Sequence, residues 1–205
     1  MKITVNKDIR NFKKGDEFDF TKILGKIGYI TLVGDNGCGK STLIHAIRGI
    51  KNDKKTNSLS ESDFIKLSQN FSIEHNYEKI FHFDNIKDNG SSMNVSYDAV
   101  EYIQSGGFYT KDKSHGESSL MYLSMFIDKI KEEIIPGKTL IVMDEVDNGF
   151  SIKNMAKFIN VVLNLNVKEQ CHVITISHNP FLIHQNGVVY DVAKKDVVLS
   201  SRFLK

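Results

Sequence analysis

The chain has 205 residues, of which 40% are hydrophobic and 25% charged, and this composition fits one globular domain or two small lobes with a stable core. Its formal net charge of +2 is too small to require a polyanionic partner. The two cysteines exclude a disulfide framework, and no run of ~18 apolar residues predicts a membrane-spanning helix. We therefore expect a cytoplasmic protein without membrane insertion, whose first residues form a strand and not a signal peptide.

The N-terminal part of the chain alternates strand signals with a loop and a helix. Three β-rich runs predict an N-terminal sheet that leads into a glycine-rich loop at 34–39: Lys2–Asn6, Glu17–Phe20 and Tyr29–Val33. The run from Ser41 to Arg48 predicts a helix that ends at Gly49. A polar loop follows at 51–62, and then two short apolar runs at Phe64–Leu67 and Ile80–Phe83.

The second half of the chain starts with a weak signal and ends with strong ones. Residues 86–113 are rich in Asn, Ser, Asp and Gly, which is compatible with a mobile lobe. Apolar residues then recur at helical spacing up to Pro136: Leu120, Leu123, Ile127, Ile130 and Ile134. The runs Thr139–Met143 and His172–Ile176 are typical of buried parallel strands. Strands separated by helical segments predict an α/β layer fold.

The segment GDNGCGKS, from Gly34 to Ser41, matches the phosphate-binding loop pattern at every fixed position, between a predicted strand and a predicted helix. We expect its backbone amides to hold phosphates, over Asn36, Gly37, Cys38, Gly39, Lys40, Ser41 and Thr42. Lys40 would reach the β- and γ-phosphates, and Ser41 would bind Mg²⁺. The chain has no Asn-Lys-x-Asp motif, so ATP is favoured over GTP.

Two later strands end in polar residues that suit hydrolysis. Asp144 and Glu145 follow the strand that starts at Thr139, so Asp144 can serve Mg²⁺ and Glu145 can polarise a water aimed at the γ-phosphate. His178 follows the strand His172–Ile176. Ligands of open α/β sheets bind beyond the carboxyl ends of the strands. These residues therefore favour a hydrolase over a small-molecule kinase, which would need a pocket for its acceptor.

The segment SHGES, which starts at Ser114, permits two readings. Ser114 and Glu117 have the spacing of a capping box, which would only start a helix. A helix N-terminus is also an anion site, and Gly116 leaves room for a phosphate near the backbone.

The ordered set GDNGCGKST, SHGES, LIVMDEVDNGFS and TISHNP resembles the ATP-binding cassette (ABC) ATPase superfamily from Lys2 to about Pro180. The likeness is to stand-alone members akin to the recombination and chromosome-maintenance ATPases, without their coiled coil. It implies an ABC-type P-loop NTPase domain over 1–205, with a mixed sheet core. An N-terminal antiparallel β subdomain would span 1–30, and a small helical signature subdomain about 86–135.

The resemblance also implies roles for individual residues. Lys40 and Ser41 would be the Walker A pair, Asp144 and Glu145 the Walker B acid and catalytic base, and His178 the switch histidine. Ser114 and Gly116 would contact an ATP that is bound by a second subunit. Phe12 and Lys13 would lie on the adenine side, and Asp147–Ser151 would form the D-loop, in which Val146 and Ser151 replace the usual proline and aspartate. The Q-loop residue is Gln69 or Asp84, and we favour Asp84, which would also serve the metal.

These roles predict an ATPase that dimerises head to tail around two ATP molecules and couples hydrolysis to an effector protein. A DNA-associated maintenance or defence ATPase is an alternative, based on Arg10, Lys13 and Lys14 near the N-terminus. An energising subunit of a membrane transport complex is another. The short signature Ser-His-Gly-Glu speaks against that reading, since transporters carry a longer form.

Overall fold

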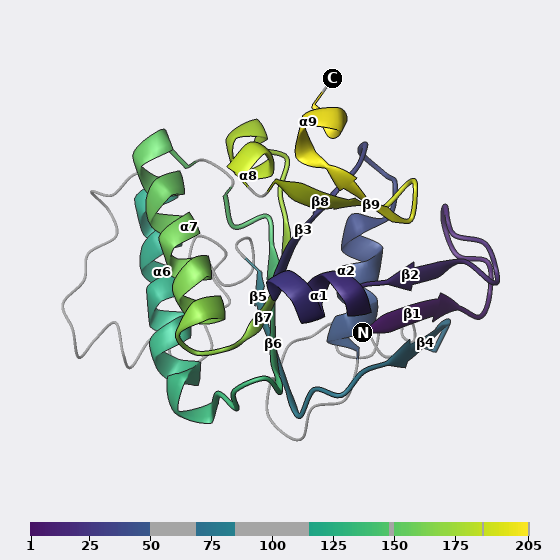
Figure 1. Ribbon diagram of the computed structural model, residues 1–205, viewed down its shortest axis with the longest axis horizontal. Helices are drawn as coiled ribbons and strands as arrows, with labels where there is room; N and C mark the ends of the chain where they lie inside the picture. The colour runs from purple at the N-terminus through teal and green to yellow at the C-terminus, as the bar shows by residue number, and fades with distance from the viewer. Residues whose placement is uncertain (50–68, 85–114, 148–149, 186, 205) are drawn as a thin grey trace.

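A computed structural model describes residues 1–49, 69–84, 115–147, 150–185 and 187–204. Its elements alternate between strands and helices along the chain (Figure 1). In chain order they are β1 (Lys2–Val5), β2 (Glu17–Asp19), α1 (Thr21–Ile27), β3 (Tyr29–Val33), α2 (Lys40–Arg48), β4 (Phe71–Glu74), β5 (Lys79–Asp84), α6 (His115–Ile130), the 3-10 turn η2 (Lys131–Glu133), β6 (Thr139–Asp144), α7 (Ile152–Val167), β7 (His172–Ile176), α8 (Pro180–Gln185), β8 (Val188–Asp191), β9 (Asp196–Leu199) and α9 (Ser200–Phe203).

The larger sheet has six strands in the order β5-β6-β7-β3-β8-β9. The pairs β5–β6, β6–β7, β7–β3 and β3–β8 are parallel, and the pair β8–β9 is antiparallel. The sheet is therefore mixed, and the α/β class expected from the sequence is confirmed. Because β3, β6 and β7 are adjacent and parallel, their carboxyl ends lie together at one edge of the sheet.

The smaller sheet is antiparallel and has the order β2-β1-β4. Strand β1 lies in its centre, with Ile3 opposite Phe18 on one side and opposite Ile73 on the other. The expectation that Tyr29–Val33 belongs to this sheet is wrong, since β3 lies in the middle of the larger sheet. A parallel strand that is buried on both faces explains its nearly continuous apolar sequence.

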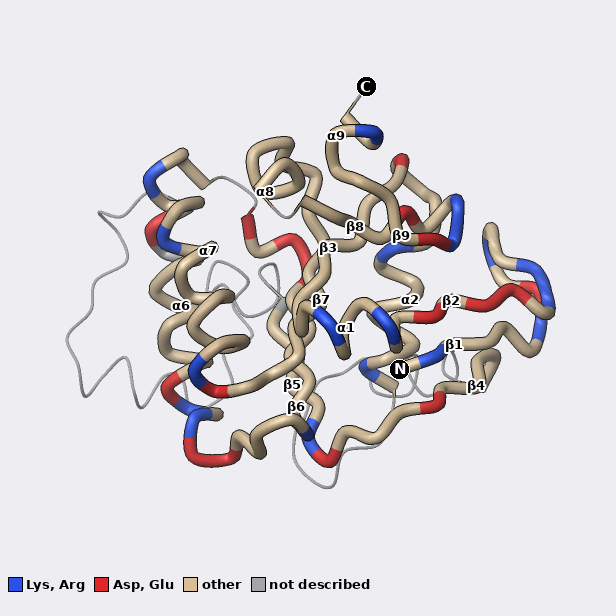
Figure 2. Tube along the Cα trace, in the orientation of Figure 1, with Lys and Arg blue, Asp and Glu red and all other residues tan. Residues whose placement is uncertain are grey.

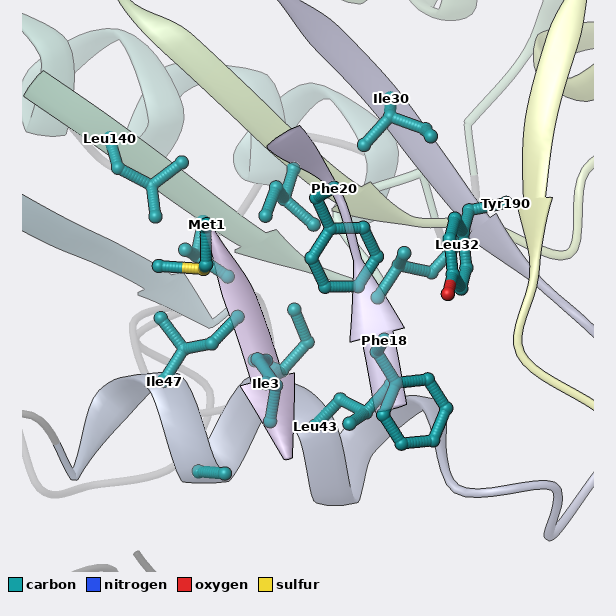
Figure 3. Close-up of a cluster of buried hydrophobic side chains, with 14 of the residues drawn as sticks. Met1, Ile3, Phe18, Phe20, Ile30, Leu32, Leu43, Ile47, Leu140 and Tyr190 are labelled. Carbon is teal, nitrogen blue, oxygen red and sulfur yellow. The ribbon is translucent and has the colours of Figure 1, made fainter. Parts of the chain in front are cut away.

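Both faces of the parallel strands are covered, by different elements (Figure 1). One face packs against α2 and the small sheet through residues that include Ile30, Leu43 and Phe18 (Figure 3). The other face packs against α6 and α7, where Leu123 and Phe158 are buried. The parallel strands are thus held between two apolar layers, and the carboxyl edge of the sheet is fixed relative to both.

The helix predicted after residue 117 is observed as α6, from His115 to Ile130. Leu123 and Ile130 are buried in the layer shared with α7, as the helical spacing predicts. Ile134 lies beyond η2, and the chain turns back toward β6 at Gly137, where φ is 70°. In the part of the chain that the structure describes, no helix combines the length and the apolar character needed to cross a bilayer.

Candidate nucleotide site

Three adjacent strands deliver the predicted site residues to one edge of the larger sheet. The loop Gly34–Gly39 follows β3, Asp144 ends β6, and Ser177 and His178 follow β7. The register places Met143 beside Thr175 and Thr31 beside Thr175, so the three strands end at nearly the same height. Buried hydroxyls of Thr31 and Thr175 also share a 2.9 Å hydrogen bond between β3 and β7. The strand register, and not sequence proximity, brings these residues together.

The glycine-rich loop uses conformations that side chains disfavour. Gly34, Gly37 and Gly39 have φ values of 141°, 83° and 108°. Such values are accessible to glycine at little cost. They allow the loop to fold back on itself and to enter α2 directly at Lys40, with Gly39 as the N-cap residue. The loop therefore leads directly into the N-terminus of α2, and a helix N-terminus is the end that binds anions.

Lys40 lies inside this loop. Its ammonium group donates to the carbonyl oxygens of Gly34, at 2.8 Å, and Asp35, at 3.2 Å. The side chain is 6% exposed. The loop whose amides would bind phosphates thus also holds the Lys40 side chain, and this places the positive charge of the ammonium group at the loop.

A tight turn in the N-terminal segment forms hydrogen bonds with the phosphate loop and the start of α2. Ile9 and Phe12 exchange backbone hydrogen bonds of 3.0 and 2.9 Å, and Arg10 between them has a φ of 50°. The Arg10 guanidinium donates to the Thr42 hydroxyl at 3.0 Å, and the Asn11 amide donates to the carbonyl of Gly37. Neither Arg10 nor Asn11 was singled out as a loop contact from the sequence, because a long-range hydrogen bond leaves no local pattern.

Phe12 and Lys13 were both expected on the adenine side. In the structure Phe12 is buried and Lys13 is exposed. The Phe12 ring is 3% exposed, and it packs edge-on against Phe18 with centroids 4.9 Å apart. It also covers Gly39, where an added Cβ would come within 2.2 Å of its Cζ atom. Lys13 is exposed and forms an ion pair with Asp8 at 3.2 Å. A contact of either side chain with adenine stays a prediction, while the contact of Phe12 with the loop is observed.

The acidic pair at the end of β6 is divided by a change of backbone direction. Asp144 is the last residue of the strand, and its Oδ1 atom is buried. Glu145 has a φ of 48°, in the left-handed region that residues other than glycine rarely adopt. Strained backbone of this kind costs about 1–3 kcal/mol and clusters at functional sites. The turn lets neighbouring carboxylates serve the same site, which a regular strand would not permit.

The two candidates for the Q-loop residue lie at different places. The backbone of Asp84 is the register partner of Asp144, on the adjacent parallel strand. Gln69 is exposed in the turn before β4, a strand of the small sheet. The register places Asp84 beside Asp144, and its role as the Q-loop and metal residue stays a prediction.

His178 is exposed in the loop between β7 and α8, whereas Ser177 directly before it is buried. Ser177 is 1% exposed and donates to a carboxylate oxygen of Asp147, which is 8% exposed. Burial raises the pKa of the Asp147 carboxyl, and the hydrogen bond from Ser177 acts in the opposite direction. Sequence reasoning assigned Asp147 only to the D-loop and missed this bond. The signal that the sequence offered for this bond was the presence of polar residues just after each of the two strands.

The residues present fit Mg²⁺ by their chemistry. The Ser41 hydroxyl lies in the first turn of α2, which packs against β6, and Asp144 ends β6. Both side chains offer the oxygen ligands that Mg²⁺ prefers, and Mg²⁺ is commonly held by one or two such side chains together with phosphates. Within the described ranges, no three His, Cys, Asp or Glu residues converge into a metal site.

Other predicted site residues are described only in part. Ser114 lies outside the described residues, and Gly116 is in the first turn of α6. Within the predicted D-loop, the backbone amide of Phe150 donates to the Asp147 carbonyl at 3.1 Å. Ser151, which replaces the aspartate of transporters, is the N-cap of α7 and accepts from the Asn154 amide at 3.2 Å. Ser151 therefore has a structural role as the residue that caps α7.

Comparisons with known proteins identify the family and the fold. The profile of the AAA domain family matches residues 6–186. The structure is similar to that of cbiO1 from Clostridium perfringens, part of the ABC transporter complex cbiONQ, with 15% identity, a TM-score of 0.55, and coverage of 99% of this chain and 89% of that one. It is also similar to the ADP conformation of MJ1267, an ATP-binding cassette of an ABC transporter, with 17% identity, a TM-score of 0.53, and coverage of 96% and 88%.

No curated protein matches the sequence. At these identities the two solved structures establish the fold, which is that of ABC nucleotide-binding domains. The family match covers most of the chain and includes the phosphate loop, the acidic pair and His178. The chain therefore belongs to the AAA domain family, as a member with the fold of the ABC ATPases.

Proposed function

We propose that the protein binds ATP with Mg²⁺ and hydrolyses it to ADP and phosphate. The observation that carries this proposal is the gathering of the phosphate loop, the Asp144–Glu145 pair and the His178 loop at the ends of three adjacent strands. Each of these groups suits one need of phosphoryl transfer to water: charge neutralisation, activation of the water, and contact with the transferred group.

In the proposed reaction the loop amides from Asn36 to Thr42 and the Lys40 ammonium bind the phosphates. Glu145 accepts a proton from water as the water oxygen bonds to the γ-phosphorus and the bond to the bridging oxygen breaks. His178 contacts the γ-phosphate. Ser41 and Asp144 would hold Mg²⁺, which offsets negative charge on the phosphates when bound.

Removal of magnesium tests the reaction without any substitution. We expect phosphate release from ATP in Mg²⁺, and its loss when EDTA exceeds the metal, since the phosphate charge is then not offset. Restoring Mg²⁺ should restore the rate. Equal release with and without EDTA would contradict a Mg-ATP hydrolase.

The proposal extends to a head-to-tail dimer in which Ser114 and Gly116 of one subunit contact an ATP held by Lys40 of the other. Its support is the resemblance of SHGES to the ABC signature and the exposure of His178 at the sheet edge, where a second chain can approach. Such a dimer is two-fold symmetric, and it contains two composite sites. ATP binding would close it and hydrolysis would release it, which suits mechanical coupling to an effector protein.

Mixing two inactive variants tests the shared site. Ser114→Arg blocks the signature and Lys40→Ala removes the phosphate-binding lysine, so each homodimer is expected to have almost no activity. In a mixed dimer one of the two sites combines intact parts of both chains. Up to about half of the mixed dimers' sites then regain turnover, as the symmetry requires. A mixture as inactive as its components would contradict the composite site.

Association with DNA receives less support from the structure. Basic and acidic residues both occur in the loop between β1 and β2 (Figure 2), where Lys13 pairs with Asp8 and Arg10 is bonded to Thr42. We therefore expect duplex DNA to leave the ATPase rate unchanged within about twofold, since phosphate-backbone binding needs unpaired cations. Strong stimulation that weakens steeply with salt would instead favour a DNA-associated ATPase.

A further inference from the structure

A buried hydrogen bond joins the two loops that carry the proposed catalytic residues. Asp147 lies three residues beyond the end of β6, and Ser177 directly follows β7. The Ser177 hydroxyl donates to Oδ2 of Asp147. The serine is 1% exposed and the aspartate 8%. Because a buried carboxylate is costly without a partner, this bond strongly favours one arrangement of the two loops.

Ser177 also restricts the backbone around His178. Its hydroxyl oxygen also accepts from the backbone amide of Asn179 at 2.9 Å. The Asn179 side chain in turn accepts from the amide of Phe181 at 2.9 Å, in the first turn of α8. The backbone of His178 is thus held on both sides, while its imidazole is exposed. Loss of the serine hydroxyl would release the loop at the residue before the histidine.

Asp147 likewise restricts the position of Glu145. The two residues belong to one turn, in which Glu145 has the left-handed φ of 48° and Val146 is 1% exposed. A buried residue between them leaves little room for independent movement. The Asp147 carboxylate therefore fixes the loop of His178 relative to the turn of Glu145.

We infer that Asp147 and Ser177 are positioning residues, whose buried hydrogen bond sets His178 and Glu145 at the separation that lets both act on one γ-phosphate. This inference rests on the proposed function, because it gives the bond a role in ATP hydrolysis. It also gives Asp147, the polar residue after Val146, a specific role.

Kinetics separate positioning from stability. Ser177→Ala is expected to lower kcat about 10- to 100-fold, the scale of a small misplacement of reacting groups. The KM for ATP should change little, because the phosphate loop is intact. If the serine acts through the histidine, adding Ser177→Ala to His178→Ala should change kcat less than about twofold. A full further loss in that background, or a kcat unchanged by Ser177→Ala, would overturn the inference.

Ser200→Ala is the matched control. Ser200 is 4% exposed and donates to the backbone carbonyl of Gly187 at 3.2 Å, so its substitution also removes the hydroxyl of a buried serine, at the start of α9. We expect its kcat to equal that of the wild type. If Ser177→Ala does not fold, the variant with both Ser177→Ala and Asp147→Leu removes the unpaired buried charge, and it should fold with the same low kcat. Wild-type kcat in that double variant would contradict positioning.

A spectroscopic measurement keeps this inference distinct from the proposed function. The imidazole signal of His178 is assigned in the NMR spectrum of the free protein by its loss in His178→Ala. Ser177→Ala should shift or broaden this signal, and Ser200→Ala should leave it in place. An unchanged His178 signal in Ser177→Ala would overturn the inference. Absence of ATP hydrolysis by the wild type would instead overturn the proposed function, while the histidine signal still decides whether the bond positions His178.

Discussion

Glu145→Gln is expected to reduce ATP turnover by about 10²- to 10⁴-fold, the usual contribution of a general base. Glutamine has almost the same size but cannot accept the proton from water. The left-handed backbone at φ 48° belongs to the turn and should persist. Binding of ATP should also persist, because the phosphate loop is unchanged. Phosphate release under saturating ATP and Mg²⁺ measures the effect.

The same variant tests dimerisation. If hydrolysis opens the dimer, Glu145→Gln should elute as a dimer from size-exclusion chromatography with ATP and Mg²⁺, and as a monomer without nucleotide. Glu132→Gln, at an exposed glutamate in η2, is the matched control and should behave like the wild type. A Glu145→Gln protein that binds ATP but stays monomeric would count against the closed dimer. Unchanged turnover would remove Glu145 from the reaction.

Gly39→Ala should disable the phosphate loop even though it removes no functional group. The new Cβ would come within 2.2 Å of Cζ of Phe12, a buried ring, at a φ of 108°. The backbone strain costs about 1–3 kcal/mol. The overpacking costs about 1–3 kcal/mol more. We expect a lower free energy of unfolding in urea and loss of ATP binding, because relief of the contact must shift the loop or the ring.

The control for this prediction is Gly25→Ala in the interior of α1. No atom lies within 4 Å of a Cβ built there, and alanine is favoured over glycine in a helix by about 1 kcal/mol. This variant should be at least as stable as the wild type and should bind ATP normally. Equal stability and equal ATP affinity of the two variants would show that Phe12 does not hold the loop as the structure places it.

The chemistry-bearing motifs were predictable because each is a short, contiguous pattern. The strand before the phosphate loop, the helix after it and the strands that lead to Asp144 and His178 all have strong apolar signals. Tyr29–Val33 and His172–Ile176 match β3 and β7 at both ends. The α/β class followed from these elements, since a sequence that alternates apolar strands with helices has few ways to bury them.

The arrangement of strands could not be derived in the same way. β3 lies between β7 and β8, which are more than a hundred residues later in the chain, and no local pattern records such pairing. β4 escaped notice because four residues are too few to give a strong strand signal, although they alternate between apolar and polar; the strand is defined by its pairing with β1. The helix α7 carries buried residues at helical spacing, such as Met155, Phe158 and Val162, so its pattern was available.

The contacts that shape the site were the least predictable part. Arg10 and Asn11 reach the phosphate loop across about thirty residues of sequence, and Ser177 reaches Asp147 across a similar distance. The packing of the buried Phe12 ring against Gly39 was not expected from the sequence either. In each case the residue type was suited to several partners, and tertiary packing selected one.

ATP is proposed to be hydrolysed at the site built around Lys40. The most direct measurement is the rate of phosphate release by Lys40→Ala, compared with that of the wild type and of Lys14→Ala, an exposed lysine near the N-terminus. All three proteins are purified in the same way and assayed with saturating ATP and Mg²⁺. We expect Lys40→Ala to lose nearly all turnover and Lys14→Ala to keep the wild-type rate. Equal rates for all three, or no phosphate release by the wild type, would contradict it.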